Sequence, residues 1–482
     1  MQPDKRVTSG ITNLDIILKD GFIPKRNYLI KGKPGTGKTI LGLHFLDRKN
    51  QKDVDALFIS FEESEKQVRS NGSNLGFDTD NIEFLDLSPK SQFFKESKNY
   101  SIFSSEEVEQ DPINDRIKRA IEDIKPERIF IDSISQFRFL TNDEYQFHKQ
   151  VLSLMRYLKE EDTTALFSSE ASQDNADDDL QFLSDGIVLL EKEEKRRHIE
   201  VQKFRGSDFH SGKHSMKITD NGIKIFPVFL SKNTERKSLG NKLSSGIPEI
   251  DQLLKGGIES STTTLISGPS GVGKTTLAIQ FMKAAAGRGE TSIIYAFDEN
   301  EQTIVKRCSS INIPIDKMIQ KGSLSIHQIE PLQYTPEEFF HTVKKEVNEK
   351  NAEIVMIDSL SGYKLSLSKK RDISKMMHIL NRSLNRMGIS TILTNEIHEL
   401  TGDFKISDID ISYLADTIIF LRYLEIKGQI RKALGILKNR LSNFERNLRE
   451  FEITKYGIKV GEPLNKLRGI LQGTPEFIEK EE

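Results

Sequence analysis

Two stretches with one pattern constrain the fold of this chain more than any other feature. The first, GKPGTGKT, covers residues 32–39, and the second, GPSGVGKT, covers residues 268–275. Each follows an apolar segment with strand character and precedes a segment with helical character. In such a turn, glycines let backbone N–H groups converge, and the helix N-terminus favours an anion. The pattern therefore predicts two phosphate-binding loops, each joining a strand to a helix.

Short apolar runs alternate with helical stretches in both halves of the chain. We expect strands at 27–32, 56–61, 128–133 and 163–170, a helix over 41–49, and further strands at 263–268, 292–297, 354–359 and 390–396. This alternation predicts an α/β fold with a mainly parallel central sheet flanked by helices. Residues 197–205 and 214–226 alternate in a hairpin-like way, so they are expected to extend the first sheet with antiparallel strands.

The two halves match in register, which indicates an internal duplication. Lys38 and Lys274 lie 236 residues apart (274 − 38), and the same offset aligns the paired acids that follow each loop. The IDS strands depart from this offset at Asp132 and Asp358, so we expect an extra loop in the first half around 97–111. The predicted organisation is a first domain over 1–230, a linker over 231–242, a second domain over 243–460 and a tail over 461–482.

Composition excludes several classes of protein. The chain has 482 residues, too many for one ordinary core, and 70 basic against 72 acidic residues give no sign of an electrostatic grip on nucleic acid. No run of about 18 apolar residues occurs, so no membrane span is expected, and residues 1–10 lack the apolar core of a signal peptide. The single cysteine, Cys308, excludes an internal disulfide. We expect it to be a buried thiol in a cytoplasmic protein.

The phosphate loops supply the candidate nucleotide ligands. In a loop of this pattern the lysine reaches the β- and γ-phosphates, and the hydroxyl that follows it binds Mg²⁺. The candidate nucleotide-binding residues are Gly35, Thr36, Gly37, Lys38 and Thr39 in the first loop and Gly271, Val272, Gly273, Lys274, Thr275 and Thr276 in the second. The threonines Thr39 and Thr275 are also candidate Mg²⁺ ligands. The alternative interpretation is an ordinary turn between a strand and a helix.

Carboxylates at the ends of later strands are candidates for the metal. Asp132 and Asp358 each end an apolar strand and precede a serine. The carboxyl end of a strand in a parallel sheet faces the ligand crevice, so these side chains are predicted to hold Mg²⁺ directly or through water. The alternative is a helix N-cap, because Asp before Ser is a common helix start.

Paired acids follow the next strand after each phosphate loop. They are Glu62 and Glu63 in the first half and Asp298 and Glu299 in the second. A carboxylate in this place can orient and deprotonate an attacking water, so these four residues are the candidate catalytic residues. The alternative is that the acids are only solvated.

Two pairs of cations lie on segments that alternate like strands. They are Lys203 with Arg205, and Lys438 with Arg440. A period of two places both cations of a pair on one face. Such a pair suits the nucleotide of a neighbouring molecule, in the manner of an arginine finger, whereas the alternative is a solvated sheet face.

Taken together, these features resemble the KaiC family. They comprise the SGI lead-in, both phosphate loops, the paired acids, the IDS strands and KFRGSDFHSGKH at 203–214. The family contains double-domain ATPases and autokinases, among them a circadian clock protein. The resemblance covers about residues 5–460, and it implies two tandem RecA-like P-loop NTPase domains that bind ATP and Mg²⁺.

The resemblance also implies assembly and roles for particular residues. KaiC-like proteins form homo-hexameric double rings with ATP between neighbouring subunits, and a KaiB-like or other regulatory protein is an implied partner. Glu62 and Glu63 match the glutamates of the ATPase-type domain, whereas Asp298 and Glu299 match those of the kinase-type domain. The pairs Lys203–Arg205 and Lys438–Arg440 match the cations that reach across the interface.

The family's phosphoacceptor pair is only partly kept. In ISDIDISYLADTIIF, Ser412 matches the serine of the pair, but Tyr413 replaces the threonine, and Ser407 matches another phosphorylatable threonine. The resemblance therefore implies autophosphorylation at Ser412, with a capping serine as the alternative. The second half also departs at KNRLSNFE, which lacks the glycine and histidine of KFRGSDFH.

Two other classes of function remain open from the sequence. A RecA-like ring can be a nucleic-acid-dependent motor or recombinase, although the balanced charge and the lack of tryptophan argue against one here. The chain can also be a scaffold that assembles on ATP with little turnover. Phosphate release and salt-sensitive nucleic-acid binding distinguish these classes from the ATPase.

Overall fold

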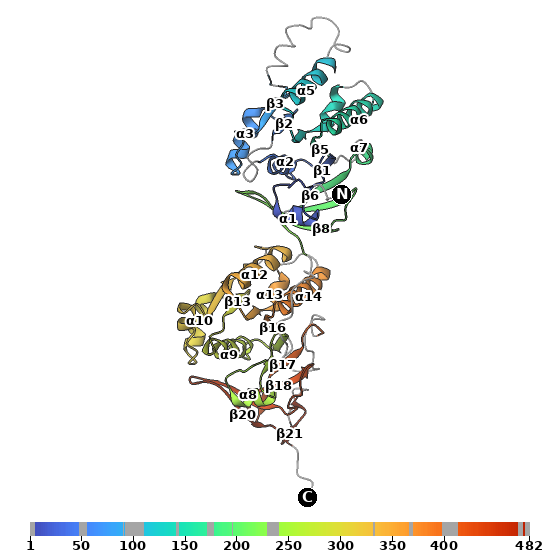
Figure 1. The fold of residues 1–482 in the computed structure, drawn as a ribbon. Helices are drawn as coiled ribbons and strands as arrows, with labels where there is room; N and C mark the ends of the chain where they lie inside the picture. The colour runs from blue at the N-terminus through green and yellow to red at the C-terminus, as the bar shows by residue number, and fades with distance from the viewer. Residues whose placement is uncertain are drawn as a thin grey trace. The chain divides into compact units, whose positions relative to one another are not determined.

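The computed structural model describes residues 5–47, 55–89, 91, 110–140, 144–170, 178–194, 196–228, 241–330, 333–365, 370–397, 413–470 and 476–477. The chain divides into two compact units, Met1–Pro227 and Val228–Glu482 (Figure 1). Each unit contains its own large sheet, and each is described here by itself.

The first unit is built on nine strands in the order β3-β2-β4-β5-β1-β6-β7-β8-β9. They are β1 (Asn27–Gly32), β2 (Ala56–Ser60), β3 (Glu83–Asp86), β4 (Arg128–Asp132), β5 (Thr164–Glu170), β6 (Gly186–Glu193), β7 (Arg196–Phe204), β8 (Lys213–Thr219) and β9 (Gly222–Phe226). In this sheet order, the first six strands, from β3 through β1 to β6, pair in parallel. The remaining strands, β7, β8 and β9, are added after β6 by antiparallel pairing. The predicted parallel sheet and its antiparallel extension are confirmed.

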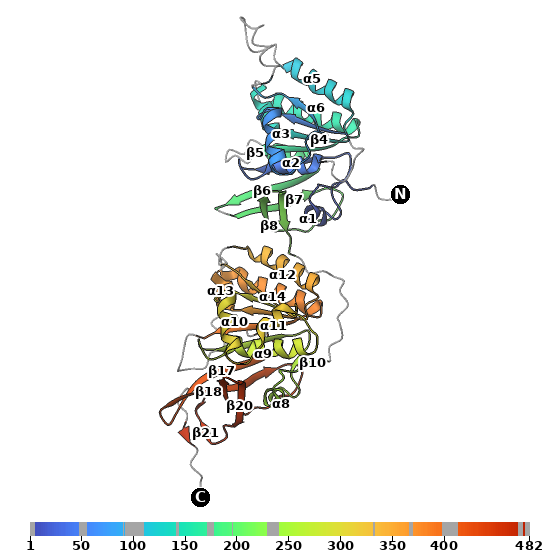
Figure 2. The same cartoon turned by 90° about the vertical axis from the view of Figure 1, so that its left-hand side faces the viewer.

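Helices cover both faces of this sheet, and Figure 2 shows α5 and β8 at opposite ends of the unit. The helices are α1 (Thr12–Ile17), α2 (Lys38–Leu46), α3 (Glu65–Asn74), α5 (Gln110–Ile124), the 3₁₀ helix η1 (Ile134–Leu140), α6 (Glu144–Glu160) and α7 (Asp178–Leu183). Alternate strand residues face opposite sides, so Phe58 and Phe130 pack with α2, while Ile59 and Ile131 pack with α5 and α6. Burial on both faces explains the continuous apolar runs.

The helix after the first phosphate loop begins and ends three residues earlier than the sequence predicts. It begins at Lys38 and ends at Leu46, because Asp47 takes an extended conformation with φ −64° and ψ 123°. The expected range of 41–49 therefore misses the first turn, which begins directly at the phosphate-loop lysine.

The second unit repeats the strand order of the first as β14-β13-β15-β16-β12-β17-β18-β19-β20. Its strands are β10 (Lys242–Leu243), β11 (Ile258–Glu259), β12 (Thr263–Gly268), β13 (Ser292–Ala296), β14 (Leu324–Gln328), β15 (Ile354–Asp358), β16 (Ser390–Glu396), β17 (Thr417–Ile426), β18 (Gln429–Asn439), β19 (Arg449–Thr454), β20 (Gly457–Pro463), β21 (Leu467–Arg468) and β22 (Glu476–Phe477). Pairing is parallel from β14 to β17 and antiparallel from β17 to β20. The predicted α/β class with tandem RecA-like units is thereby confirmed.

Two apolar cores enclose the second sheet as well. Its helices are α8 (Pro248–Leu253), α9 (Lys274–Gly287), α10 (Glu301–Ser309), α11 (Ile315–Gln320), α12 (Pro336–Lys350), α13 (Leu360–Leu365) and α14 (Lys370–Arg386). Ile294 and Met356 pack with α9, and Ile293 and Val355 pack with α12 and α14 on the other face. Ile470 is buried beside Leu424 and Ala433 in a smaller cluster. Among the described residues, no helix is long and apolar enough to cross a membrane.

Candidate nucleotide-binding sites

The predicted phosphate loops connect β1 to α2 and β12 to α9. Gly37 and Gly273 come directly before the two helices, with φ of 110° and 117°. This left-handed conformation favours glycine. At Gly273 an added Cβ would also lie 2.6 Å from Cδ1 of Ile453, so that side chain would have to move. Glycine at these positions lets the first amides of each helix face a bound anion.

The other candidate residues of the phosphate loops are buried or have left-handed backbone conformations. Thr36 is buried and donates to the carbonyl of Lys33 across 2.8 Å, and Val272, at the equivalent position of the second loop, is fully buried. The remaining candidates of this group are Gly35 and Gly271, with φ of 74° and 72°, and the buried Thr276 of α9. We infer that these residues contribute backbone and packing, and that the lysines and the threonines after them contribute ligand atoms.

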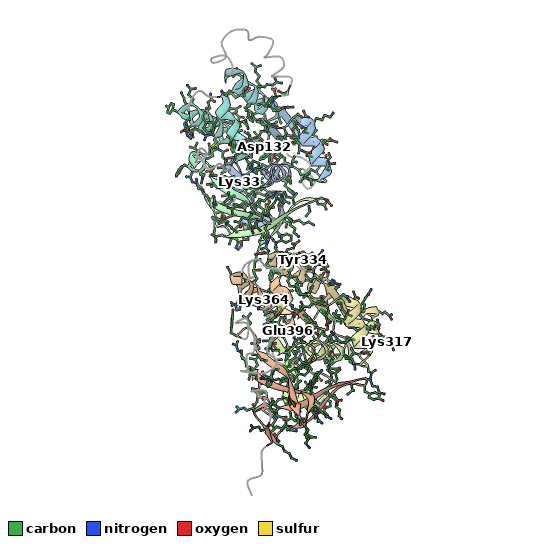
Figure 3. The ribbon with its side chains drawn as sticks, turned by 180° about the vertical axis from the view of Figure 1, so that it is seen from behind. Lys33, Asp132, Lys317, Tyr334, Lys364 and Glu396 are labelled. Carbon is green, nitrogen blue, oxygen red and sulfur yellow. The ribbon has the colours of Figure 1, made fainter. Side chains whose placement is uncertain are left out.

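Both loop lysines turn their ammonium groups back onto their own loops. Lys38 Nζ donates to Gly32 O at 2.9 Å, and Lys274 Nζ donates to Pro269 O at 2.8 Å. Burial lowers the pKa of Lys274, and the charge of Glu396 is the largest of the effects that oppose this shift. Glu396 ends β16 and is labelled in Figure 3. An ammonium in this place can exchange loop carbonyls for the phosphates of a nucleotide.

The residue after each lysine meets the predicted metal-binding aspartate. Thr39 Oγ1 donates to Asp132 Oδ2 across 2.6 Å, and Thr275 Oγ1 donates to Asp358 Oδ2 across 2.9 Å. The threonines begin α2 and α9, whereas the aspartates end β4 and β15 (Asp132 is labelled in Figure 3). The structure therefore brings together all four candidate metal ligands, as one pair in each unit.

A second hydroxyl, which the sequence analysis missed, holds the other oxygen of each aspartate. Ser168 Oγ donates to Asp132 Oδ1 at 2.5 Å, and Thr394 Oγ1 donates to Asp358 Oδ1 at 2.5 Å. Both hydroxyls lie on the strand next to the aspartate, two residues before the glutamate that ends β5 or β16. The signal was available, because FSSE and LTNE place a hydroxyl at the same position of the duplicated strand.

The two aspartates fit a Mg²⁺ ion. Burial raises the pKa of both Asp132 and Asp358, although the hydrogen bonds from the two hydroxyls lower it. An ionised carboxylate in such a place is stabilised by a nearby cation. Among the described residues, no three His, Cys, Asp or Glu side chains gather into a protein-only metal cage. Mg²⁺ suits this donor set, since it commonly binds one carboxylate and fills its shell with phosphate oxygens and water.

The first acid of each predicted catalytic pair is held by the serine of the IDS motif. Ser133 Oγ donates to Glu62 Oε1 at 2.9 Å, and Gln136 Nε2 donates to the same oxygen at 3.0 Å. In the second unit Ser359 Oγ donates to Asp298 Oδ2. Because each serine directly follows the predicted metal-binding aspartate, this bond brings a candidate base close to the candidate metal ligand. The sequence analysis gave no role to these serines.

The second acid of each pair has a different partner in each unit. Asn71 Nδ2 donates to Glu63 Oε2 at 3.1 Å in the first unit. In the second unit Arg307 Nη1 donates to Glu299 Oε1 at 2.6 Å and forms an ion pair with it. Neither Asn71 nor Arg307 carries a motif that sequence reasoning could have recognised.

Comparison with known proteins agrees with the duplicated geometry. A model of the KaiC ATPase family matches residues 7–228 and 243–465. The chain belongs to the KaiC family. The circadian clock protein KaiC3 of Synechocystis sp. is 28% identical over 494 aligned positions, which cover 99% of this chain and 96% of that protein. The circadian clock oscillator protein KaiC of Prochlorococcus marinus subsp. pastoris is 28% identical over 98% of this chain and 94% of its own length.

In this KaiC-family chain the four candidate interface cations bind backbone carbonyls ahead of β6 and β17. The bonds are Lys203 Nζ to Gln181 O at 2.5 Å, Arg205 Nη2 to Phe182 O at 3.4 Å, Lys438 Nζ to Ala415 O at 2.7 Å and Arg440 Nη2 to Tyr413 O at 2.9 Å. The structure therefore directs both cations of each pair toward one segment, and not toward the carbonyls that bind the loop lysine.

The strand assignment of the two arginines needs correction. Sequence analysis expects them on strands, whereas β7 ends at Phe204 and β18 at Asn439, one residue before each arginine. The physical reason is that Asp185 and Asp416 directly precede β6 and β17, so the bond from each arginine N–H to the aspartate carbonyl is the last one of the pairing.

Lys203 and Arg205 help to line a hollow of about 600 Å³ in the first unit. Its lining residues are Gln181, Phe182, Ile187, Gln202, Lys203 and Arg205. Burial, followed by the charge of Arg205, lowers the pKa of Lys203. The Phe182 side chain is 74% exposed at this surface. The hollow thus combines two cations with an accessible aromatic ring.

The predicted phosphoacceptors, Ser412 and Ser407, lie outside the described residues, as do residues 97–109 of the expected extra loop. Tyr413, which follows Ser412, accepts a hydrogen bond from Arg440 through its carbonyl.

Proposed function

We propose that this KaiC-family ATPase binds Mg²⁺ and ATP in both units and acts as a homo-hexameric ring with a signalling or timing role. The first unit would mainly hydrolyse ATP, and the second would transfer phosphoryl groups to the chain's own Ser412. The observation that carries the proposal is the Thr–Asp pair at each phosphate loop, at 2.6 Å and 2.9 Å. A pair repeated across two diverged halves supports ligand binding better than a turn that merely joins two elements.

Binding of ATP would use the loop amides, the loop lysines and the threonines after them. Lys38 and Lys274 would pair with the β- and γ-phosphates. Asp132 with Thr39, and Asp358 with Thr275, would hold Mg²⁺, and the raised pKa of the buried aspartates supports a cation there. When bound, Mg²⁺ offsets the negative charge on the phosphate oxygens.

Glu62 is the proposed proton acceptor in the first unit. In hydrolysis, the oxygen of a water forms a bond to the γ-phosphorus while the bond from that phosphorus to the bridging oxygen breaks, and ADP leaves. The proton of the water passes to the carboxylate. The hydrogen bonds from Ser133 and Gln136 support this role, since a base with a fixed orientation reaches the water more often. Glu63 lies next to it and would assist.

In the second unit the same chemistry would act on a serine hydroxyl in place of water. Asp298 takes the position of Glu62 and is held by Ser359. Its side chain is one methylene shorter, so its carboxylate would reach less far toward the nucleophile. Ser412 is the proposed acceptor. Support comes from its neighbour Tyr413, whose carbonyl accepts a hydrogen bond from Arg440, one of the candidate interface cations.

Assembly into a ring would bring the interface cations to a neighbour's nucleotide. Lys203 and Arg205 share one hollow, and Lys438 and Arg440 share one backbone segment. Two cations held together suit the phosphates of a bound nucleotide better than a single one. A KaiB-like or other regulatory protein is the corresponding proposal for a partner.

The test measures turnover, phosphate incorporation and assembly in one sample. The full chain is incubated with Mg²⁺ and γ-labelled ATP, followed by assays of phosphate release, phosphosite mapping and native mass measurement. Lys38→Ala should remove most phosphate release and weaken assembly. Lys274→Ala should mainly remove the incorporated label.

Several outcomes would contradict the proposal. Normal phosphate release by Lys38→Ala would overturn the division between the units. Nucleotide binding without phosphate release in the unaltered protein would favour an ATP-gated scaffold. Label found only on residues other than Ser412 would overturn the assignment of the acceptor.

A further inference from the structure

The second candidate site contains an ion pair that its counterpart in the first unit lacks. Arg307, on α10, donates through Nη1 to Glu299 Oε1 at 2.6 Å. Both side chains are about one-third exposed. Arg307 Nε and Nη2 and Glu299 Oε2 are buried and have no hydrogen-bond partner among the described residues. The pair is therefore mainly a contact between these two side chains.

The first unit supplies an internal comparison at the same spacing. Asn71 lies eight residues after Glu63 (71 − 63), as Arg307 lies eight residues after Glu299 (307 − 299). Each partner lies on the helix that follows the paired acids, α3 or α10. The Asn71 contact is longer, at 3.1 Å, and it is exposed. One position thus carries a neutral amide in one unit and a cation in the other.

This difference changes the charge that lies next to the second acid of each pair. A cation at hydrogen-bond distance stabilises the charged form of a carboxylate, whereas an amide adds no net charge. Burial by itself lowers the pKa of Arg307, but the hydrogen bond and charge of Glu299 raise it overall, so the guanidinium remains charged. The other titratable groups near this pair, among the described residues, include Asp358, Cys308, Asp298 and Lys274.

We propose that Arg307 is a positioning residue that restrains the second site by holding Glu299 in an ion pair, which leaves Asp298 as the proton acceptor there. This inference rests on the proposed function of the site. The proton of the attacking hydroxyl passes to Asp298 as the new P–O bond forms and the bond to the bridging oxygen of ADP breaks. Glu299 remains charged and paired throughout.

The experiment isolates the second site in the full chain. The background Glu62→Gln/Glu63→Gln removes the candidate bases of the first unit while leaving its phosphate loop intact. In this background Arg307→Asn copies the first unit, and Arg307→Lys keeps the positive charge. Steady-state turnover of Mg²⁺–ATP and label incorporation are measured from pH 5 to pH 9, with nucleotide binding as the check of folding.

We expect Arg307→Asn to raise kcat about fivefold or more with little change in KM, because a second carboxylate becomes available as a base. The acidic limb of its kcat profile should move to higher pH, which a purely structural role would not cause. Arg307→Lys should stay near the parent. In the parent, Asp298→Asn should cost more than Glu299→Gln, and in Arg307→Asn the cost of Asp298→Asn should fall, because Glu299 can then take part of the role.

The reciprocal variant tests the same idea at an exposed position, where folding is less at risk. Asn71→Arg, in an Asp298→Asn/Glu299→Gln background, should lower kcat of the first unit. Two results for Arg307→Asn would overturn the proposal. One is an unchanged or lower kcat while nucleotide still binds, and the other is an acidic limb of the kcat profile that stays at the same pH. Failure of the proposed function has a distinct result, since the unaltered chain would then release no phosphate and incorporate no label, and the inference would be overturned with it.

Discussion

The Thr275 hydroxyl donates to Asp358 Oδ2 across 2.9 Å, although 83 positions separate the two residues in the chain. The same contact joins Thr39 to Asp132 across 2.6 Å and 93 positions. Strand order explains the contact, because only one strand separates β1 from β4 and β12 from β15. The start of the helix after each phosphate loop therefore lies beside the carboxyl end of the aspartate strand.

Replacing either Asp132 or Asp358 by asparagine should remove most of the Mg²⁺-dependent activity of its unit. We expect Asp132→Asn to lower Mg²⁺-dependent phosphate release about 100-fold, because the amide cannot supply the negative charge that a divalent ion needs. Asp358→Asn should instead mainly lower phosphate incorporation. Titration of Mg²⁺ at fixed ATP measures both effects. Ser168→Ala, which removes only a neutral hydrogen bond to Asp132, should retain the Mg²⁺ dependence and is the matched control.

Binding of Mg²⁺ and nucleotide should weaken with acid earlier than an ordinary aspartate would allow. Burial raises the pKa of Asp358, so protons compete with the metal at a higher pH than usual. Because the pKa of Asp358 is higher in the folded chain than in the unfolded chain, the folded chain holds this proton more tightly. Protonation of Asp358 therefore stabilises the fold fully at pH values below the pKa of the unfolded chain. This stabilisation is lost as the pH rises through the pKa of the folded chain.

Calorimetric binding of Mg²⁺–nucleotide across this range tests the metal part, with Asp358→Asn as the control that should lose the pH dependence. The same substitution should not lower the thermal stability of the ligand-free protein at neutral pH. A large drop in that stability would contradict the sign given above.

The close approach of α2 to the sheet predicts a large penalty for one added methyl group. At Gly42 a Cβ would lie 2.2 Å from the ring of Phe130, which is fully buried. Gly42→Ala should therefore lower the free energy of unfolding of the first unit by about 1–3 kcal/mol, despite the better helix propensity of alanine. Gly287→Ala is the matched control, since no atom from outside its own stretch of helix lies within 4 Å of its added Cβ. Urea unfolding measures both variants.

The single thiol should be inert in the folded protein. Cys308 is fully buried, and burial raises its pKa to about 11. At pH 8 roughly one thiol in a thousand would be ionised, and the thiolate is the reactive form. Iodoacetamide should therefore label the native chain slowly and the urea-unfolded chain fast. Rapid labelling of the native protein would show that α10, which carries Cys308 and Arg307, opens readily.

Much of the fold could be predicted because it follows from local patterns. The apolar runs are buried strands, and the alternation at 197–205 and 214–226 becomes the antiparallel extension from β7 to β9. The ends of elements were less predictable. Asp47 ends α2 by its own backbone conformation, and β7 ends at Phe204 although Arg205 still donates to Asp185. The apolar pattern marks neither end.

The sequence by itself determined the phosphate loops and their repetition, because the left-handed turns at Gly37 and Gly273 are a local property of the backbone. Only the tertiary structure decided which groups meet the strand-end carboxylates. The Ser133 bond to Glu62 and the Arg307 bond to Glu299 depend on how strands order in the sheet and how α10 is rotated against it. Pairing between side chains from separate elements leaves no periodic signal along the chain, so two halves with matching motifs can carry different electrostatics at equivalent positions.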